Sequence, residues 1–480
     1  MSLLLMLGLA TIPFNAAPEA DFNAPRFGVV PVWLNADWGY PQLGDYRGFE
    51  QDAYPAHLDS VESAGITWIR VNCAFRWDII EETQGSPNFE LEDSIVVWAQ
   101  ERGINVVPVV THTPRWARQR DLDYEYDNYR RPPDPEHMDD WAAFCSTFVE
   151  RYDGDGIGDI SGLRYPLKYW QISNEPNGAC SFYGTLREYL EYFRRGCEGM
   201  RSADPAIQII GPTLAGKTSW KRPREAEEGD FAEMKVPARP GFWLDTILVE
   251  IGACIDIVCE QRYGEPRQIF RYLDATVKPV MDRHGKDRFW MTETGWNLDW
   301  VGITEKAQAA KYAEFCKYFL ETDWFERVFF FSLTDFGHRY GDRYRWRFGM
   351  LDLPGLSPRA AYSTYRGFIK EHGVCLTVVP DPAHSRRPVT FTVTNNGNET
   401  ITLRGVPWFT VTDSSGGVVF RDLAVQAAAA MAPDQSAEYV WHRIDSSGDQ
   451  VEAGLYTVEV RYFQGDCMYL LSSEFEILSP

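Results

Sequence analysis

The chain has 480 residues, more than one ordinary hydrophobic core holds, so its length predicts two or three domains. Its formal net charge of -22 argues against a nucleic-acid partner, because such a partner would require a basic surface. Beyond the N-terminal segment, no stretch approaches the ~20 consecutive apolar residues that a membrane span needs.

Residues 1–25 form a segment of their own. Residues 2–14 are largely apolar and are followed by Asn15-Ala16-Ala17, which resembles a signal-peptide core with a small-residue cleavage site. Because no Lys or Arg precedes the apolar run, a disordered tail is the alternative. Localisation therefore stays open between a secreted or periplasmic protein and a cytoplasmic one.

From residue 26 to residue 373, strand-like and helix-like patterns alternate, which is typical of a parallel sheet wrapped by helices. Apolar runs predict strands at residues 27–33, 66–72, 104–110, 167–173, 207–210, 255–261 and 328–333, with one more beginning at Phe289. Amphipathic patterns predict helices at residues 56–64, 92–102, 139–152, 186–200, 242–251, 268–284, 305–320 and 360–371. Asp139 or Asp140 is available as the N-cap of the third of these helices.

Two of the predicted strands end in a glutamate. Residues 169–176 are YWQISNEP and residues 289–296 are FWMTETGW, so Glu175 and Glu293 each lie where an aromatic strand leaves the sheet. In a β/α barrel this edge is the active face. Two carboxylates there suit glycoside hydrolysis, in which one protonates the leaving oxygen and the other attacks the anomeric carbon. The alternative is that both glutamates cap helices beside the barrel.

The two motifs together resemble the acid/base and nucleophile strands of clan A glycoside hydrolases, in the family thirty-nine-like branch. The resemblance covers roughly residues 27 to 373. It implies a retaining (β/α)₈ barrel that acts on carbohydrate without a cofactor or catalytic metal, with Glu175 as acid/base on the fourth strand and Glu293 as nucleophile on the seventh. It also implies that Asn174 binds the substrate 2-hydroxyl. A catalytically silent carbohydrate-binding barrel is the alternative.

Three further residues at predicted strand ends have counterparts in the clan. Arg70, on the second strand, resembles the arginine beside the nucleophile, where its charge keeps the carboxylate ionised. Tyr263, after the sixth strand, matches the clan tyrosine that contacts the nucleophile, although an ordinary loop aromatic fits the sequence equally well. His112 ends the third strand, where it would bind a sugar hydroxyl, orient a carboxylate or serve a structural role.

Several tryptophans are candidates for sugar-binding surfaces. Trp77 and Trp116 resemble clan patterns that shape subsites, with core packing as the alternative. On the eighth strand the clan presents a Trp as a sugar platform, but residues 332–336 of this chain are SLTDF. The candidates to replace that platform are Phe336, Trp296 and Trp346.

The loop before the fourth strand contains Asp153, Asp155 and Asp159, with glycines between them. Spaced aspartates let several oxygens converge on a cation while glycines permit a sharp turn, so the loop resembles a structural calcium site. It lacks the late bidentate glutamate of an EF-hand, and an Asp/Gly turn is the alternative. Calcium bound there would brace the acid/base strand.

After Gly373 the pattern becomes all-β, which predicts an immunoglobulin-like β-sandwich over residues 374–480. Residues 409–413, 417–420 and 454–458 resemble the sandwich domains of the bacterial intracellular proteinase-inhibitor type. Such a module would dock on the barrel, bind carbohydrate or inhibit a protease. Cys375 and Cys467 fall in this region and would pair if the chain is exported. Nothing in the sequence determines the oligomeric state.

Overall fold

The computed structural model describes residues 21–31, 54–72, 74–118, 130–177, 181–215, 241–340, 343–352, 355–379, 383–384, 388–404, 409–421 and 429–479. They divide into two compact units at the boundary between Gly373 and Val374, the first beginning at Asn23. Within these described ranges, none of the helices combines the length and hydropathy needed to cross a bilayer.

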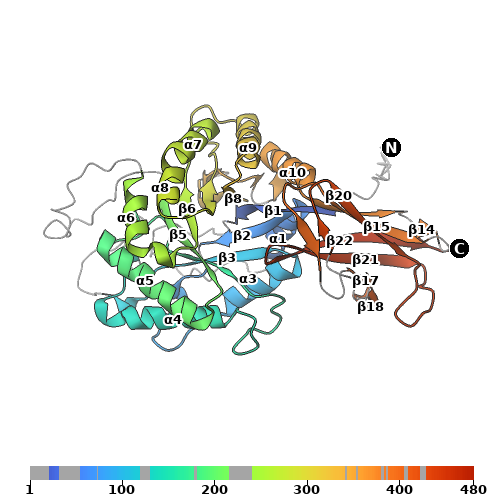
Figure 1. Ribbon diagram of the computed structural model, residues 1–480, viewed down its shortest axis with the longest axis horizontal. Helices are drawn as coiled ribbons and strands as arrows, with labels where there is room; N and C mark the ends of the chain where they lie inside the picture. The colour runs from blue at the N-terminus through green and yellow to red at the C-terminus, as the bar shows by residue number, and fades with distance from the viewer. Residues whose placement is uncertain are drawn as a thin grey trace, which may run out of the picture. The chain divides into compact units, whose positions relative to one another are not determined.

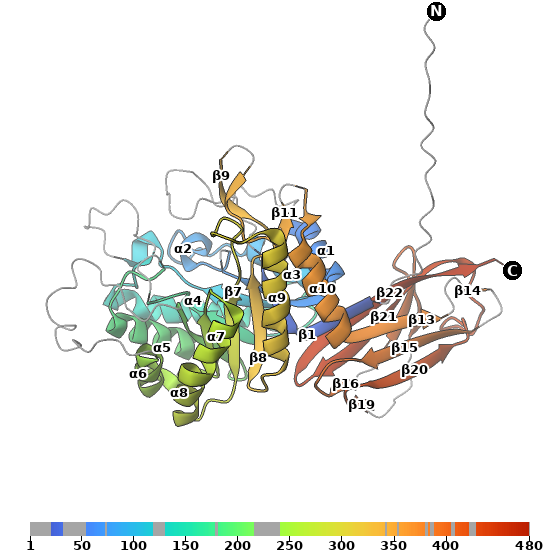
Figure 2. The same cartoon turned by 90° about the horizontal axis from the view of Figure 1, so that it is seen from above.

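The first unit is a closed barrel of eight parallel strands, which confirms the predicted (β/α)₈ architecture (Figures 1 and 2). Strand β1 pairs with both β8 and β2, and this pairing closes the sheet. The strands are β1 (Asp21–Val30), β2 (Ile66–Val71), β3 (Asn105–Val110), β4 (Tyr169–Ile172), β5 (Gln208–Ala215), β6 (Ile257–Gln261), β7 (Phe289–Thr294) and β8 (Phe325–Phe331).

Helices surround this barrel in Figure 1. They are α1 (Tyr54–Ser63), the short α2 (Trp77–Ile80), α3 (Glu90–Glu101), α4 (Met138–Glu150), α5 (Leu186–Ala203), α6 (Phe242–Ile251), α7 (Pro266–Tyr272), α8 (Lys278–Arg283), α9 (Glu305–Leu320) and α10 (Ala360–His372). The expected single helix over residues 268–284 is α7 and α8 joined by a π-helical segment, Leu273–Val277.

The predicted cap of the helix after β3 is wrong. Helix α4 begins at Met138, its N-cap is His137, and no side chain caps it. Asp139 and Asp140 lie in its first turn, where their charge still complements the helix dipole. The helix starts early because the 3₁₀ turn Pro135–His137 runs directly into it.

Aromatic side chains and the Arg327 guanidinium pack together in the barrel interior. Trp68 on β2 and Trp290 on β7 are almost completely buried and meet edge to face at 5.8 Å. Tyr169 on β4 stacks on Trp290 at 5.1 Å, and the Arg327 guanidinium lies 3.9 Å from the Trp68 ring centroid. Trp68 and Trp290 are therefore core residues, and their ring and cation–π contacts stabilise this packing.

The second unit is a β-sandwich, as predicted, and its strand pairs are antiparallel except for β14 with β22. Strand β15 (Val389–Asn395) pairs with β13 (Val374–Val379) and β20 (Gln435–Trp441). The other strands are β14 (Ala383–His384), β16 (Ile401–Leu403), β17 (Phe409–Asp413), β18 (Val418–Arg421), β19 (Ala429–Met431), β21 (Gly454–Gln464) and β22 (Cys467–Leu478). Val389, Phe391 and Val393 alternate with more exposed threonines, which confirms the predicted half-buried strand.

Cys375 and Cys467 both occur as thiols in this unit. The Asn396 side-chain amide donates to Cys375 Sγ at 3.3 Å. A disulfide between the two cysteines stays a prediction that depends on export.

Candidate active site

One buried arginine links the predicted catalytic residues. Arg70 is 0% exposed, and its Nη1 donates to Glu293 Oε1 at 2.7 Å. Its Nη2 donates to Asn174 Oδ1 at 2.5 Å, and its Nε donates to Gln171 Oε1 at 2.7 Å. The contacts therefore join residues from β2, β4 and β7 at one end of the barrel. A guanidinium suits this task because its donors form a rigid, planar fork.

Asn174 is held in one orientation by two donors. Its Oδ1 accepts from Arg70 Nη2 and also from Gln261 Nε2, the latter at 2.6 Å. Gln171 is fixed in turn, since its Nε2 donates to the Ser173 carbonyl at 2.7 Å. The Asn174 amide is half-buried, and both of these hydrogen bonds are accepted by its oxygen, which leaves the donor capacity of its NH₂ group for a ligand.

Tyr263 contacts Glu293 on the side opposite Arg70. Its hydroxyl donates to Glu293 Oε2 at 2.7 Å, so each carboxylate oxygen has its own donor. Burial, together with the negative charges of Glu293 and Glu175, raises the pKa of Tyr263 well above its usual value. Tyr263 therefore stays a neutral hydrogen-bond donor over the whole physiological pH range.

An irregularity in β7 turns Glu293 toward the barrel axis. The pairing of β7 with β6 shifts register before Glu293, and its pairing with β8 shifts register between Met291 and Thr294. Trp290 and Glu293 both face β2 across the barrel, through contacts with Trp68 and Arg70, although they are three residues apart. A regular strand alternates faces with a period of two, so this placement requires the bulge.

Glu175 lies just beyond β4 on a tight backbone turn. Ser173 and Glu175 both have left-handed φ values, 67° and 43°. The Glu175 backbone N–H donates to the Thr213 carbonyl at 3.1 Å. Asn177 ties the same turn to β5, because its side-chain amide exchanges two hydrogen bonds with the Ala215 backbone. The half-buried Glu175 side chain is near enough to act electrostatically on Tyr263.

His112 lies beside the catalytic strands rather than among the carboxylates. The pairing of Val110 with Ile172 places it level with Asn174. Its Nδ1 is 3.8 Å from Asp78 Oδ1, and Arg76 donates two hydrogen bonds to the same carboxylate. Burial, with the charges of Arg76, Arg130 and Arg118, lowers the pKa of His112 well below its usual value. The imidazole is therefore neutral.

Trp77 and Trp116 form a cluster around Glu81. Trp77 Nε1 donates to the Glu81 carboxylate and Trp116 Nε1 donates to the Glu81 carbonyl, both at 2.8 Å. Trp77 is 0% exposed and packs on Phe144, so core packing replaces the subsite role expected of it. Trp116 is half-buried and meets Trp77 edge to face.

The three candidates to replace the sugar platform lie in different environments. Trp296 is 1% exposed and packs against Tyr312 and Phe330, so its faces cannot stack on a ligand. Trp346 is half-buried at the end of β10 (Arg343–Trp346), which pairs with β9 (Phe336–Tyr340). The Phe336 side chain lies outside the described part of the structure.

Sequence reasoning missed Gln171, Gln261 and Asn177. A glutamine on a buried strand gives no catalytic signal of its own, although a polar side chain on an otherwise apolar strand indicates a paired group. Gln261, on β6, holds Asn174 through its side-chain amide.

The aspartates of the expected calcium loop converge. One oxygen from each of Asp153, Asp155 and Asp159 lies within 4.8 Å of the others. The Asp159 carboxylate also accepts from the backbone N–H groups of Gly154 and Gly156. Carboxylate oxygens at this spacing suit a hard cation, and they also suit an Asp/Gly turn. Calcium binding stays a prediction.

No protein-family model matches the chain, and no curated protein matches its sequence. Solved structures share its fold. A family 39 glycoside hydrolase from the gut symbiont Bacteroides cellulosilyticus WH2 aligns over 87% of this chain and 81% of its own, with a TM-score of 0.52 and 15% identity.

Two more matches cover nearly complete chains. The family 39 enzyme from Xanthomonas axonopodis pv. citri has a TM-score of 0.52 and 13% identity over 97% of each chain. A monomeric β-xylosidase from Caulobacter crescentus CB15 has a TM-score of 0.51 and 12% identity over 96% of this chain and 99% of that one. These likenesses confirm the predicted clan A resemblance at the level of the fold.

Proposed function

We propose that this protein is a retaining β-glycoside hydrolase, with Glu175 as acid/base and Glu293 as nucleophile. The observation that carries the proposal is the Arg70 guanidinium, which binds the Glu293 carboxylate and the Asn174 amide at once. The buried Glu293 carboxylate accepts from a fixed cation on one oxygen and from a tyrosine hydroxyl on the other, so its charge is complemented and its position is fixed. These are the requirements for an attacking group.

In the first step, Glu175 transfers a proton to the glycosidic oxygen while Glu293 attacks the anomeric carbon. The bond from that carbon to the leaving oxygen breaks as the bond to Glu293 forms. The Asn174 NH₂ group donates to the sugar 2-hydroxyl, a hydrogen bond that strengthens in the transition state.

In the second step, Glu175 accepts a proton from water as the water oxygen attacks the same carbon. The ester bond to Glu293 breaks, and both carboxyl groups return to their starting states. Each turnover consumes one water and releases two hydroxyl-bearing products. Because the carbon is attacked twice from opposite faces, its configuration is retained.

A panel of 4-nitrophenyl glycosides tests the proposal. It begins with the β-xyloside and β-glucoside, because solved structures with this fold include a β-xylosidase and a glucosidase from Croceicoccus marinus. We expect nitrophenol release from at least one β-glycoside, and proton NMR of the first product should show the β-anomer. No release from any β-glycoside would favour a silent carbohydrate-binding barrel, and release at the same rate by wild type and Glu293→Gln would reject Glu293 as the nucleophile. An α-anomer would reject retention.

A further inference from the structure

The loop that follows the nucleophile strand presents a tryptophan to solvent. Trp300 is 38% exposed, whereas every other tryptophan whose side chain the structure describes is buried or half-buried. A single exposed apolar side chain on a protein surface needs no explanation by itself. Trp300, however, lies next to a tyrosine that contacts Glu293, so its exposure is relevant to ligand binding.

Trp300 belongs to an aromatic wall that borders Glu293. Its ring centroid lies 6.3 Å from that of Tyr263 and 5.4 Å from that of Phe348. Tyr263 is the residue whose hydroxyl donates to Glu293 Oε2. Phe348 also packs on Tyr263, at 5.7 Å, and on Phe331, at 5.3 Å. The wall therefore extends directly from the nucleophile.

Two rings of this wall are covered, while Tyr263 is half-buried. Phe331, at the end of β8, is 5% exposed and Phe348 is 7% exposed, so neither offers a face to a ligand. Both ring contacts of Trp300 are nearly perpendicular, at 84°. No aromatic ring within the described residues is recorded in a parallel stack on the indole. Trp300 is thus the most exposed ring of the wall.

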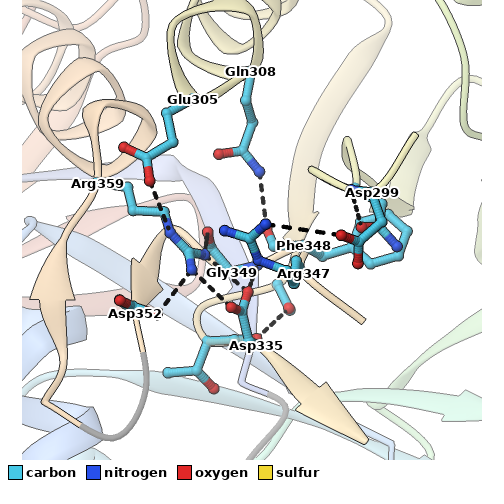
Figure 3. A network of polar contacts seen from close by, with 12 residues as sticks. Asp299, Glu305, Gln308, Asp335, Arg347, Phe348, Gly349, Asp352 and Arg359 are labelled. Carbon is cyan, nitrogen blue, oxygen red and sulfur yellow. Dashed lines mark hydrogen bonds and ion pairs between the residues drawn. The ribbon is translucent and has the colours of Figure 1, made fainter. Parts of the chain in front are cut away.

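The loop that carries Trp300 is held in place by the segment after β8. The Leu298 N–H donates to the Arg347 carbonyl at 2.9 Å, and the Arg347 guanidinium lies 3.8 Å from Asp299 (Figure 3). Turn hydrogen bonds from the Trp300 N–H to the Asn297 carbonyl and from Ile303 to Trp300 complete the loop. These contacts fix the backbone that carries the indole.

A buried ion pair anchors that segment in turn. Arg359 donates two hydrogen bonds to the Asp335 carboxylate, at 2.8 and 2.7 Å, and a third to the Gly349 carbonyl (Figure 3). The Gly349 N–H donates to Asp335 Oδ1, next to Phe348. Gly349 has no room for a side chain, since an added Cβ would lie 2.4 Å from the Asp335 nitrogen. The clamp thereby fixes Phe348 against Tyr263 and Trp300.

We infer that Trp300 is the sugar-stacking residue of this site and binds the apolar face of the pyranose ring that Glu293 attacks. The inference rests on the proposed function for the identity of that ligand. Indole faces suit the C–H side of a pyranose because both surfaces are flat and apolar, while the hydroxyls project sideways to polar partners such as Asn174. Trp300 takes the place that the chain leaves without a tryptophan on its eighth strand.

Steady-state kinetics on the best-hydrolysed nitrophenyl β-glycoside provide the first test. Trp300→Ala should raise KM about tenfold with a much smaller change in kcat, because stacking binds the ground state and transition state alike. Trp300→Phe should restore most of the loss. Val301→Ala is the matched control, since that neighbour is the most exposed apolar side chain described. An unchanged KM in Trp300→Ala would overturn the inference and leave the proposed function standing.

Binding in an inactive background separates the two proposals. Glu293→Gln, with and without Trp300→Ala, is titrated calorimetrically with 4-nitrophenyl 1-thio-β-glycosides, which resist hydrolysis. Loss of affinity on removing Trp300 supports the inference even if the wild-type protein hydrolyses no glycoside. Equal affinity in the two backgrounds, or no binding in either, would overturn it. Equal thermal unfolding midpoints of the two variants establish that the loop substitution leaves the fold intact.

Discussion

The two strand ends that carry the glutamates hold their carboxyl groups in different ways. Glu293 at the end of β7 is 5% exposed and has a charged donor on one oxygen and a hydroxyl on the other. Glu175 beyond β4 is half-buried, and the fold fixes its backbone through the Thr213 carbonyl. A nucleophile must stay ionised and still, whereas an acid/base exchanges protons with the leaving group and water. The difference matches the two proposed roles.

Removing either glutamate should have the largest effect on activity. Glu293→Ala and Glu175→Ala should each lower kcat/KM by ~10⁴-fold or more on substrates with poor leaving groups. Azide should rescue Glu293→Ala to a product of inverted configuration, because the anion attacks from the vacated cavity. It should rescue Glu175→Ala, stalled as the glycosyl enzyme, to a product of retained configuration.

Product NMR and azide titration measure this outcome. Glu321→Ala, at an exposed glutamate after α9, is the control and should keep full activity. The same rescue stereochemistry for both mutants would contradict the assignment of roles, as would near-normal activity in either.

Removing the cation beside Glu293 should have the next largest effect. Arg70→Met leaves a buried carboxylate without its charged partner, which typically destabilises a protein by about 3–5 kcal/mol. It also removes one of the two donors that position the Glu293 carboxylate for attack, so kcat should fall by about 100-fold or more. Arg70→Lys keeps the positive charge but loses the planar, forked set of donors. Its stability and kcat should therefore lie between those of the wild type and Arg70→Met. Chemical denaturation and kinetics give the two readouts, and a stable, fully active Arg70→Met would exclude a role for this pair.

The carboxyl group of Glu260, on the strand next to β7, is held neither as that of Glu293 is nor as that of Glu175 is. Glu260 on β6 is 2% exposed, and its contacts with Arg262 and Tyr272 are long, at 3.4 Å each. Burial raises the pKa of Glu260 to about 7, more than Arg262 and Tyr272 offset. The folded state holds this proton more tightly than the unfolded chain does, so protonated Glu260 contributes to the free energy of unfolding. This contribution is fully present below pH ~4.5 and is lost as the pH rises through about 7.

Glu260→Gln should therefore remove a pH dependence of stability. Between pH 5 and pH 8 the wild type should lose roughly 2–3 kcal/mol more than the mutant in the free energy of unfolding. Urea denaturation at both pH values measures the difference, while kcat/KM serves as the control because Glu260 touches none of the catalytic residues. Parallel stability profiles would show that Glu260 is already ionised in the folded protein.

Removing the hydroxyl beside Glu293 should have a moderate effect. Tyr263→Phe keeps the ring contacts with Trp300 and Phe348 but loses one hydrogen bond to the carboxylate, so kcat should fall by about 10- to 100-fold. KM should change little, in contrast to Trp300→Ala. A KM effect that equals the Trp300→Ala effect would mean that Tyr263 acts through the aromatic wall rather than through Glu293.

The smallest expected effect concerns the loop that precedes β4. Calcium should raise the thermal midpoint by a few degrees over the chelated protein, since a ligand that binds the folded state stabilises it. Asp155→Asn should abolish that shift without altering kcat. A midpoint that is the same with calcium and with chelator would leave Asp153, Asp155 and Asp159 as an ordinary turn.

Local patterns were enough to predict an alternating α/β domain with a glutamate at the end of two strands, while the eight-stranded barrel was implied by the clan resemblance. The alternation of apolar strands with amphipathic helices depends on spacings of two and 3.6 residues, and Pro or Gly after each glutamate marks the strand end. Arg70 was predictable for a related reason, since a charge on a buried strand demands a partner. The identity of its second and third partners, Asn174 and Gln171, depends on strands about a hundred residues away.

Trp296 and Trp300 show what the sequence left undecided. Both follow the same strand four residues apart, yet Trp296 packs under α9 against Tyr312 while Trp300 stands at the aromatic wall. Which of the two rings is covered depends on how α9 and the segment around Phe348 pack in the folded protein. Local sequence periodicity does not determine that packing. The bulge that turns Glu293 inward has the same origin. It arises from the register of β7 against both of its neighbours, so only the closed barrel determines it.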